Sequence, residues 1–215
     1  MTELYFAAAV VVAYLLGSLS FAVIISRLMG LGDPRSYGSK NPGATNVLRS
    51  GNKLAAVLTL LLEAVKGWLP TAAVTGYGAA WGLGSGAVAA VGLAAFLGHL
   101  YPVFFKFKGG KGVATAAGVL LGVHPVLGLA VLVTWLLVAY FTRYSSLSAL
   151  ISAVAAPLIY LMLDRLVWYV DGRLTLALVL MSALLIWRHQ QNIAKLIRGQ
   201  ESKIGAKDAS QRAER

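Results

Sequence analysis

Residues 4–25, LYFAAAVVVAYLLGSLSFAVII, form an apolar run without a charged side chain. A helix needs about 20 residues to cross the roughly 30 Å hydrocarbon core of a bilayer, so this run predicts a membrane-spanning helix. Further apolar runs cover residues 54–74, 81–103, 113–141, 147–163 and 174–187. Hydrophobic residues make up 58% of the 215 and charged residues only 13%, which excludes an ordinary soluble domain. The sequence therefore predicts an all-α integral membrane protein.

The first run begins almost at Met1, with no basic segment before it and no clear cleavage site after it. We therefore expect a retained helix rather than a signal peptide.

Lysine and arginine residues are unevenly distributed among the connections between the runs. They follow the first and third runs, precede residues 147–163 and follow the last run, whereas residues 75–86 carry no charge. Residues 164–173 carry two arginines balanced by two aspartates. Because basic loops stay in the cytoplasm, this pattern predicts an N-terminus outside and a cytoplasmic C-terminus. The net charge of +11 is thus assigned to membrane orientation, and no nucleic-acid partner is expected.

Residues 113–141 are too long for one upright span and too short for two full ones. Lys111 and Arg143 flank this run and both indicate the cytoplasm, so the chain must cross and return, turning near His124 and Pro125. The first limb, residues 113–122, is a half-length helix of roughly 15 Å. This predicts seven transmembrane helices, one of them short, in a single domain of residues 1–204. Residues 205–215 are expected to form a polar, disordered cytoplasmic tail.

Four polar clusters lie on the predicted cytoplasmic side. They are residues 38–49 (GSKNPGATNVLR), 106–115 (KFKGGKGVAT), 143–148 (RYSSLS) and 188–192 (RHQQN). In the second cluster glycines expose backbone N–H groups, a lysine adds charge and a helix follows, which suits a phosphate group. The spacing is not that of a Walker A loop, and an ordinary basic glycine loop is an equally good interpretation of this cluster alone.

Side chains in the third and fourth clusters have simpler explanations beside the functional ones. Ser145 or Ser146 could cap the helix that follows. His189 and Asn192 are three residues apart and are expected to share one helix face. A single histidine at a membrane interface is usually incidental, but this one lies beside Asn192 on the side that carries the other clusters.

Glu63 and Lys66 are the exceptional charges, because they fall about 15 Å into a predicted span. Buried ions often mark a functional site, but these two can pair with each other, so we favour a structural role. Small residues at Gly78, Gly82 and Gly86, and at Gly118 and Gly122, are expected to serve helix packing, and are spaced four apart in both sets.

The four clusters together suit an anionic, phosphate-bearing ligand that meets a lipid. The clusters lack the paired carboxylates of two-metal or acid–base hydrolysis, the chain lacks cysteine, and a Ser-His-Asp triad is poorly supported. Direct group transfer by positioning and charge neutralisation remains, with no metal or other cofactor. Two alternatives stay open: a transporter or channel for an organic phosphate, and, less well supported, a lipid phosphatase.

Conspicuous motifs occur along the chain: LLGSLS at residues 15–20, GDPR at 32–35, GSKNPGATNVLR at 38–49, GHLYPVFF at 98–105, KGGKGVAT at 108–115, YSSL at 144–147, Arg188-His189, Asn192-Ile193 and QESKI at 200–204. Together these segments resemble the PlsY family of bacterial acyl-phosphate:glycerol-3-phosphate acyltransferases. Glu63 is one departure, since the family is expected to carry aspartate there.

The resemblance implies a seven-helix protein of the bacterial inner membrane, with its active site on the cytoplasmic face. It would make lysophosphatidic acid from acyl phosphate and glycerol 3-phosphate, without acyl-CoA, and could contact the enzyme that forms acyl phosphate. The oligomeric state stays open. The proton of the attacking hydroxyl would pass to His189 or to the substrate's own phosphate.

The expected site residues fall into three groups. Those expected to be catalytic are Ser39, His189 and Asn192; those expected to bind substrate are Asn41, Thr45, Asn46, Arg49, Lys108, Gly109, Gly110, Lys111, Gly112, Ser145 and Ser146; those expected to be structural are Glu63, Lys66 and Glu201.

Overall fold

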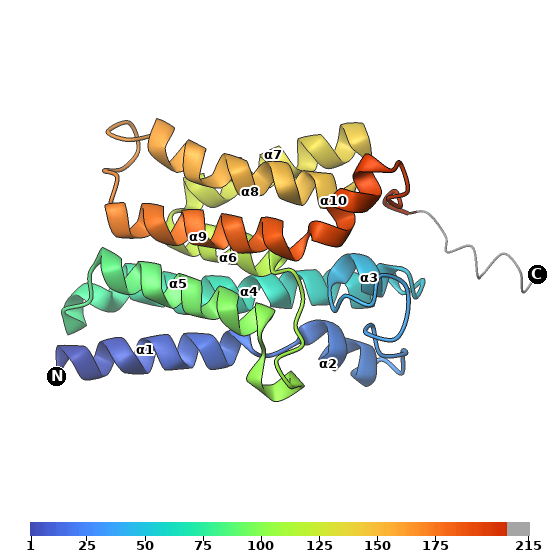
Figure 1. The fold of residues 1–215 in the computed structure, drawn as a ribbon. Helices are drawn as coiled ribbons and strands as arrows, with labels where there is room; N and C mark the ends of the chain where they lie inside the picture. The colour runs from blue at the N-terminus through green and yellow to red at the C-terminus, as the bar shows by residue number, and fades with distance from the viewer. Residues whose placement is uncertain (206–215) are drawn as a thin grey trace, which may run out of the picture.

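The computed structural model describes residues 1–205, which form a bundle of α-helices running along one long axis (Figure 1). Two short 3-10 helices, Gly78–Trp81 and Val103–Phe105, lie in connections. Apart from Gly205, the predicted tail lies outside the described residues. The α-helices are α1 (Thr2–Gly17), α2 (Phe21–Leu28), α3 (Ala44–Leu48), α4 (Lys53–Tyr77), α5 (Ser85–Leu100), α6 (Val113–Val123), α7 (Pro125–Thr142), α8 (Ser145–Met162), α9 (Gly172–Arg188) and α10 (Gln190–Ile197).

Several helices have the length and composition of membrane spans, as predicted. Within residues 1–205, four helices qualify alone, and six spans result if the bent pairs α1–α2 and α9–α10 each count as one. Helix α6 is apolar but shorter than these. The integral membrane character is therefore confirmed, whereas the count of seven spans stays a prediction.

The sequence suggested one continuous helix for the first apolar run, but the structure shows two helices. The chain leaves the helical path between α1 and α2, and the two helix axes differ by 45°. At the end of α1, Gly17 lies against the backbone of Ala95 in α5, with no room for a Cβ atom. The break therefore sits inside the bundle, at a point where α1 and α5 approach closely.

The predicted half helix is confirmed. Helix α6 ends at Val123, His124 is extended, and Pro125 begins α7, where its missing N–H is tolerated. Gly118 and Gly122 of α6 lie directly against the backbone of α4, as expected for small residues spaced four apart.

The other proposed stripe of small residues is wrong. Gly78 lies in the short 3-10 helix, Gly82 follows it with a φ of +72°, and Gly86 belongs to α5. These three glycines therefore do not share one helix.

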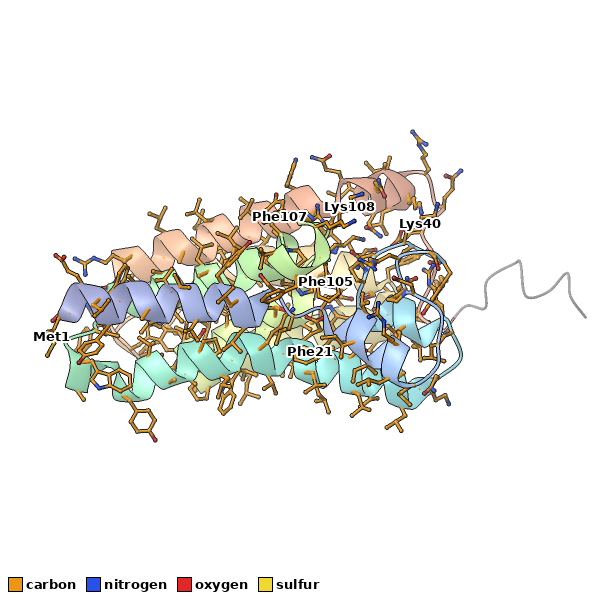
Figure 2. All side chains as sticks on the ribbon, turned by 90° about the horizontal axis from the view of Figure 1, so that it is seen from below. Met1, Phe21, Lys40, Phe105, Phe107 and Lys108 are labelled. Atoms are coloured by element: carbon orange, nitrogen blue, oxygen red, sulfur yellow. The ribbon has the colours of Figure 1, made fainter. Side chains whose placement is uncertain are left out.

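The polar clusters gather around one half of the bundle. Figure 1 shows α2, α3 and α10 at the end opposite Met1, and Figure 2 shows Met1 and Lys40 at opposite ends with Phe105 and Lys108 between them. Residues 108–112 before α6 form a glycine-rich loop, called the glycine loop below. Because α6 is short, this loop lies partway along the bundle rather than at its tip (Figure 1).

Candidate active site

The loop formed by residues 38–49 is held by the amide of Asn46, which is buried. Its Oδ1 atom accepts a hydrogen bond from the Ser39 N–H at 2.9 Å. Its Nδ2 group donates to the carbonyls of Pro34 at 2.6 Å and Tyr37 at 3.2 Å. These bonds use the Asn46 amide within the loop itself, so the geometry favours loop positioning over the substrate contact expected for it.

Ser39 and Gly38 show what this loop presents. Gly38 has a φ of +56°, and a Cβ atom there would meet the Asn46 amide and the Arg49 side chain. Ser39 is exposed, and within residues 1–205 its hydroxyl makes no hydrogen bond. The loop therefore exposes Ser39 directly after Gly38, whose backbone lies against the Arg49 side chain.

Two contacts join this loop to distant parts of the chain. Thr45 Oγ1 lies 3.3 Å from Ser145 Oγ at the start of α8, and Arg49 donates to Ser202 Oγ at 2.6 Å. Neither Ser145 nor Ser146 caps α8, contrary to the proposed capping role, because the N-cap residue is Tyr144 and no side chain caps there. Both serines instead face neighbouring polar segments.

Lys111 takes part in a connected set of side-chain hydrogen bonds. Its Nζ atom donates to Asn192 Oδ1, and Asn192 Nδ2 donates to Glu201 Oε1 at 2.7 Å. Ser146 Oγ donates to the same carboxylate oxygen at 2.6 Å. The second, third and fourth clusters are thus joined through Glu201, which is consistent with its expected structural role.

Burial lowers the pKa of the Lys111 ammonium to about 8, and the nearby Arg49, Lys195 and Arg188 act in the same direction against Glu201. Because these cations lie close together, binding of an anion between them would be favourable.

The start of α6 adds backbone N–H groups to this positive region. Its N-cap residue is Gly112, with a φ of +84°, and no side chain caps the helix. The first N–H groups of a helix lack intrahelical partners and attract anions. Gly109 and Gly110 lie too close to neighbouring carbonyls for a Cβ atom, so close packing also explains these glycines.

His189 lies at the junction between two helices, a bend that its spacing from Asn192 had not shown. Helix α9 ends at Arg188, α10 departs from it at 58°, and His189 is the N-cap residue of α10, the helix that contains Asn192. Their shared face stays a prediction. Buried His189 has its Nδ1 atom 2.8 Å from the Leu185 carbonyl, which can only accept, so Nδ1 carries the proton. Burial lowers the pKa of this imidazole to about 4, which leaves it neutral near pH 7 with a lone pair on Nε2.

Three residues without an assigned role prove to be close to the site. Arg188 donates to the carbonyls of Gly109 at 2.8 Å and Gly110 at 3.1 Å, and so holds the glycine loop. His99 accepts from the Gly110 N–H through its carbonyl oxygen. Ser202 contacts Arg49. All three belong to the quoted motifs, but only the folded chain shows what they contact.

Lys108 and Asn41, two of the expected binding residues, make fewer polar contacts. Lys108 is exposed and Asn41 is half-buried, and within residues 1–205 neither side chain makes a hydrogen bond. Their expected substrate contacts stay predictions.

Residues 7–199 match the model of the glycerol-3-phosphate acyltransferase family. The chain belongs to this family. A glycerol-3-phosphate acyltransferase of Paraburkholderia phytofirmans is 64% identical over 203 residues, covering 92% of this chain and 90% of the relative. The enzyme of that name from Albidiferax ferrireducens is 60% identical over 205 residues, covering 95% and 92%. The recognition made from the motifs is thus confirmed.

Two crystal structures of PlsY, an integral membrane glycerol 3-phosphate acyltransferase, share the fold of this acyltransferase-family chain. The glycerol 3-phosphate form has a TM-score of 0.85 and 38% identity, covering 94% of this chain and 96% of the other. The lysophosphatidic acid form has a TM-score of 0.83 and 37% identity over the same shares. This agreement extends over nearly the whole chain and confirms the family's all-helical membrane architecture for these residues.

Proposed function

We propose that this protein transfers a fatty acyl group from acyl phosphate to the C1 hydroxyl of glycerol 3-phosphate. The products are lysophosphatidic acid (1-acyl-glycerol 3-phosphate) and inorganic phosphate, in the first acylation of bacterial phospholipid synthesis. The observation that carries the proposal is the joining of Lys111, Asn192 and Glu201 at the N-terminus of α6, in a family named for this acceptor.

Both substrates carry phosphate, so the main physical task is to hold two anions close together. Lys111 and Arg49 belong to two polar segments that the fold brings to one side of the bundle. They are close enough for the charge of Arg49 to lower the pKa of Lys111. Together with the N–H groups at the start of α6, they offset the repulsion between the substrates. We assign Lys111 and the glycine loop to glycerol 3-phosphate.

The chemistry requires one new bond and one broken bond. The C1 oxygen of glycerol 3-phosphate attacks the acyl carbonyl carbon, and the bond from that carbon to the phosphate oxygen breaks. Phosphate is a good leaving group in such a mixed anhydride, so strong acid assistance is unnecessary. The Ser39 hydroxyl and main-chain N–H groups are suited to stabilise the oxyanion that develops.

The attacking hydroxyl must lose its proton. His189 is held as the neutral tautomer with a lone pair on Nε2, so it is suited to act as a general base. The phosphate of glycerol 3-phosphate itself is the alternative acceptor.

We propose that the clusters face the cytoplasm. The positive-inside pattern supports this orientation, because residues 27–53, 106–111, 143 and 188–215 carry 16 of the 19 lysines and arginines. Glycerol 3-phosphate would then enter from water and acyl phosphate from the bilayer. The half-length of α6 allows a polar site below the membrane surface, where non-helical backbone is tolerated beside a cavity.

Reconstituted vesicles test the proposal against transport. Labelled glycerol 3-phosphate is supplied with and without acyl phosphate, and both internal label and lysophosphatidic acid are measured. We expect lysophosphatidic acid only when acyl phosphate is present and no accumulation of label without it. Uptake that does not need acyl phosphate would favour a transporter and contradict the proposal.

A further inference from the structure

A buried ion pair lies where α1 and α2 separate. Lys66 Nζ and Glu63 Oε2 are 2.5 Å apart, and each side chain is 2% exposed. Both residues belong to α4, and neither contacts the predicted substrate segments directly. Their pairing confirms the sequence prediction, but it does not explain what the pair does in the bundle.

The pair satisfies backbone groups that the helix break leaves exposed. Lys66 donates to the Leu19 carbonyl at 2.6 Å, and Glu63 Oε1 accepts from the Ala22 N–H at 3.3 Å. The ammonium therefore lies beyond the C-terminus of α1 and the carboxylate at the N-terminus of α2, which is the favourable arrangement for both helix dipoles. This accounts for the charges within a membrane protein, where free backbone groups are costly.

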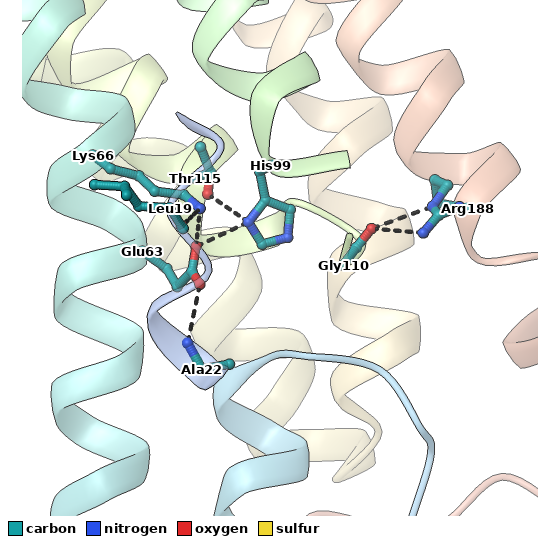
Figure 3. A network of polar contacts seen from close by, with 8 residues as sticks. All are labelled: Leu19, Ala22, Glu63, Lys66, His99, Gly110, Thr115 and Arg188. Carbon is teal, nitrogen blue, oxygen red and sulfur yellow. Dashed lines mark hydrogen bonds and ion pairs between the residues drawn. The ribbon is translucent and has the colours of Figure 1, made fainter. Parts of the chain in front are cut away.

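The network continues beyond this structural task, through His99 at the end of α5 (Figure 3). Its Nδ1 atom lies 2.9 Å from Glu63 Oε2 and 3.2 Å from Thr115 Oγ1 in the first turn of α6. Because a carboxylate paired with Lys66 accepts, Nδ1 carries the proton and Nε2 is the atom on the other side of the ring. Glu63 thus fixes both the tautomer and the orientation of the ring.

The other side of His99 meets the glycine loop. Its carbonyl accepts from the Gly110 N–H at 3.3 Å, and a Cβ atom on Gly110 would collide with His99 Nε2. Arg188 holds the opposite side of the loop through the Gly109 and Gly110 carbonyls. Figure 3 shows Gly110 between His99 and Arg188. The loop backbone is therefore fixed from two sides, directly before Lys111.

We infer that Glu63 and His99 are positioning residues for glycerol 3-phosphate binding: they set the path of the glycine loop and thereby the placement of Lys111. This inference rests on the proposed assignment of that loop to glycerol 3-phosphate. Because the network already orders the loop, glycerol 3-phosphate does not have to order the loop N–H groups and the Lys111 ammonium when it binds. It touches no reacting atom.

His99→Asn is the sharpest test, because asparagine keeps a donor near the Nδ1 position and leaves the Glu63–Lys66 pair intact. It removes the part of the ring that abuts Gly110. We expect the KM for glycerol 3-phosphate to rise about tenfold, the change expected on losing one positioning contact, with kcat within about twofold and an unchanged thermal midpoint. The KM for acyl phosphate should stay the same.

Glu63→Gln is the second variant, and Glu63→Asp the conservative one. The glutamine variant should raise the same KM and also lower the thermal midpoint, while the aspartate variant should recover most of the affinity because the charge survives. Asp171→Ala is the matched control, since Asp171 caps α9 at the far end of the bundle and accepts from Ser85 at 2.7 Å. It should lower the midpoint without changing the KM for glycerol 3-phosphate.

Lys111→Ala, measured alongside, separates this inference from the function on which it rests. If Lys111→Ala raises the KM for glycerol 3-phosphate and His99→Asn does not, the site stands and the positioning role is overturned. If Lys111→Ala also leaves that KM unchanged, the loop assignment itself is wrong and the inference falls with it. A Glu63→Gln variant that resembles Asp171→Ala would reduce the network to a structural role.

Discussion

At the scale of single residues, the charge of Lys111 depends on its surroundings. Burial holds its pKa at about 8, well below the usual range for lysine. A bound phosphate dianion would favour the protonated form. The affinity for glycerol 3-phosphate must therefore depend on pH in the range where Lys111 loses its proton.

Between pH 7 and pH 9 we expect the KM for glycerol 3-phosphate to rise by up to about tenfold, because the fraction of protonated Lys111 falls by that factor around a pKa of 8. The substrate phosphate, with a second pKa of about 6, keeps its charge over this range. Steady-state kinetics in detergent measures the effect.

Lys111→Arg is the control for this pH dependence. An arginine stays charged throughout, so its KM should be nearly constant between pH 7 and pH 9, whatever its absolute value. An unchanged KM in the wild-type protein would contradict the role of the Lys111 charge. The same pH dependence in the arginine variant would show that another group titrates.

His189 gives the second prediction at this scale. With the neutral tautomer acting as base, His189→Ala should lower kcat by about a hundredfold or more and change both KM values little. A variant that kept its turnover and lost only affinity for glycerol 3-phosphate would contradict the base role. It would favour a binding role for His189, with the phosphate of glycerol 3-phosphate as the proton acceptor.

At the scale of structural elements, the loop of residues 38–49 depends on one side chain. Asn46→Ala removes three hydrogen bonds, to Ser39, Pro34 and Tyr37, all of them with backbone groups before α3. We expect a loss of about 2 kcal/mol or more in stability and a large loss of activity. A thermal-unfolding assay in detergent measures the first effect.

Asn41→Ala is the matched control in the same loop. The Asn41 amide makes no hydrogen bond within residues 1–205, so its removal should leave the thermal midpoint unchanged, whatever it does to substrate binding. Equal midpoints for the two variants would contradict the positioning role of Asn46.

The contact between α4 and α6 depends on glycine. A Cβ atom at Gly118 would collide with the Ala64 carbonyl, so Gly118→Ala should force the helices apart and cost about 1–3 kcal/mol, seen as a lower thermal midpoint. Gly76→Ala in α4 meets nothing within 4 Å and should leave the midpoint unchanged or raise it. Equal losses in both variants would show that packing against α4 is not the cause.

The sequence predicted the elements well where one strong rule applied. Apolar runs predicted the long helices, and Pro125 between two basic flanks predicted the turn between α6 and α7. The break between α1 and α2 was not predicted, because no charge or proline interrupts the run and the partners of the freed backbone, Glu63 and Lys66, lie more than forty positions away. The bend after Arg188 was missed because spacing alone cannot show where a helix ends.

The candidate site was predicted in outline and less well in detail. The charge pattern placed the four clusters on one side, and the structure joins them through contacts such as Lys111 with Asn192 and Thr45 with Ser145. The roles of His99 and Arg188 could not be read in advance, because both act through the backbone of the glycine loop. Whether the expected residues bind and react as proposed stays a prediction.

At the scale of the whole molecule, the bundle places one polar site beside the bilayer. The half helix α6 begins at this site, and α2, α3 and α10 surround it on the side opposite Met1 (Figure 1). A lipid-soluble donor and a water-soluble acceptor could therefore meet at one site. We propose that the acyl group passes there directly from acyl phosphate to glycerol 3-phosphate.

The most direct test is product formation by the purified protein when acyl phosphate and acyl-CoA are offered separately with glycerol 3-phosphate. We expect lysophosphatidic acid and inorganic phosphate in equal amounts from acyl phosphate, and no product from acyl-CoA. Product formed equally well from acyl-CoA, or acyl phosphate consumed without transfer to glycerol 3-phosphate, would contradict the proposal.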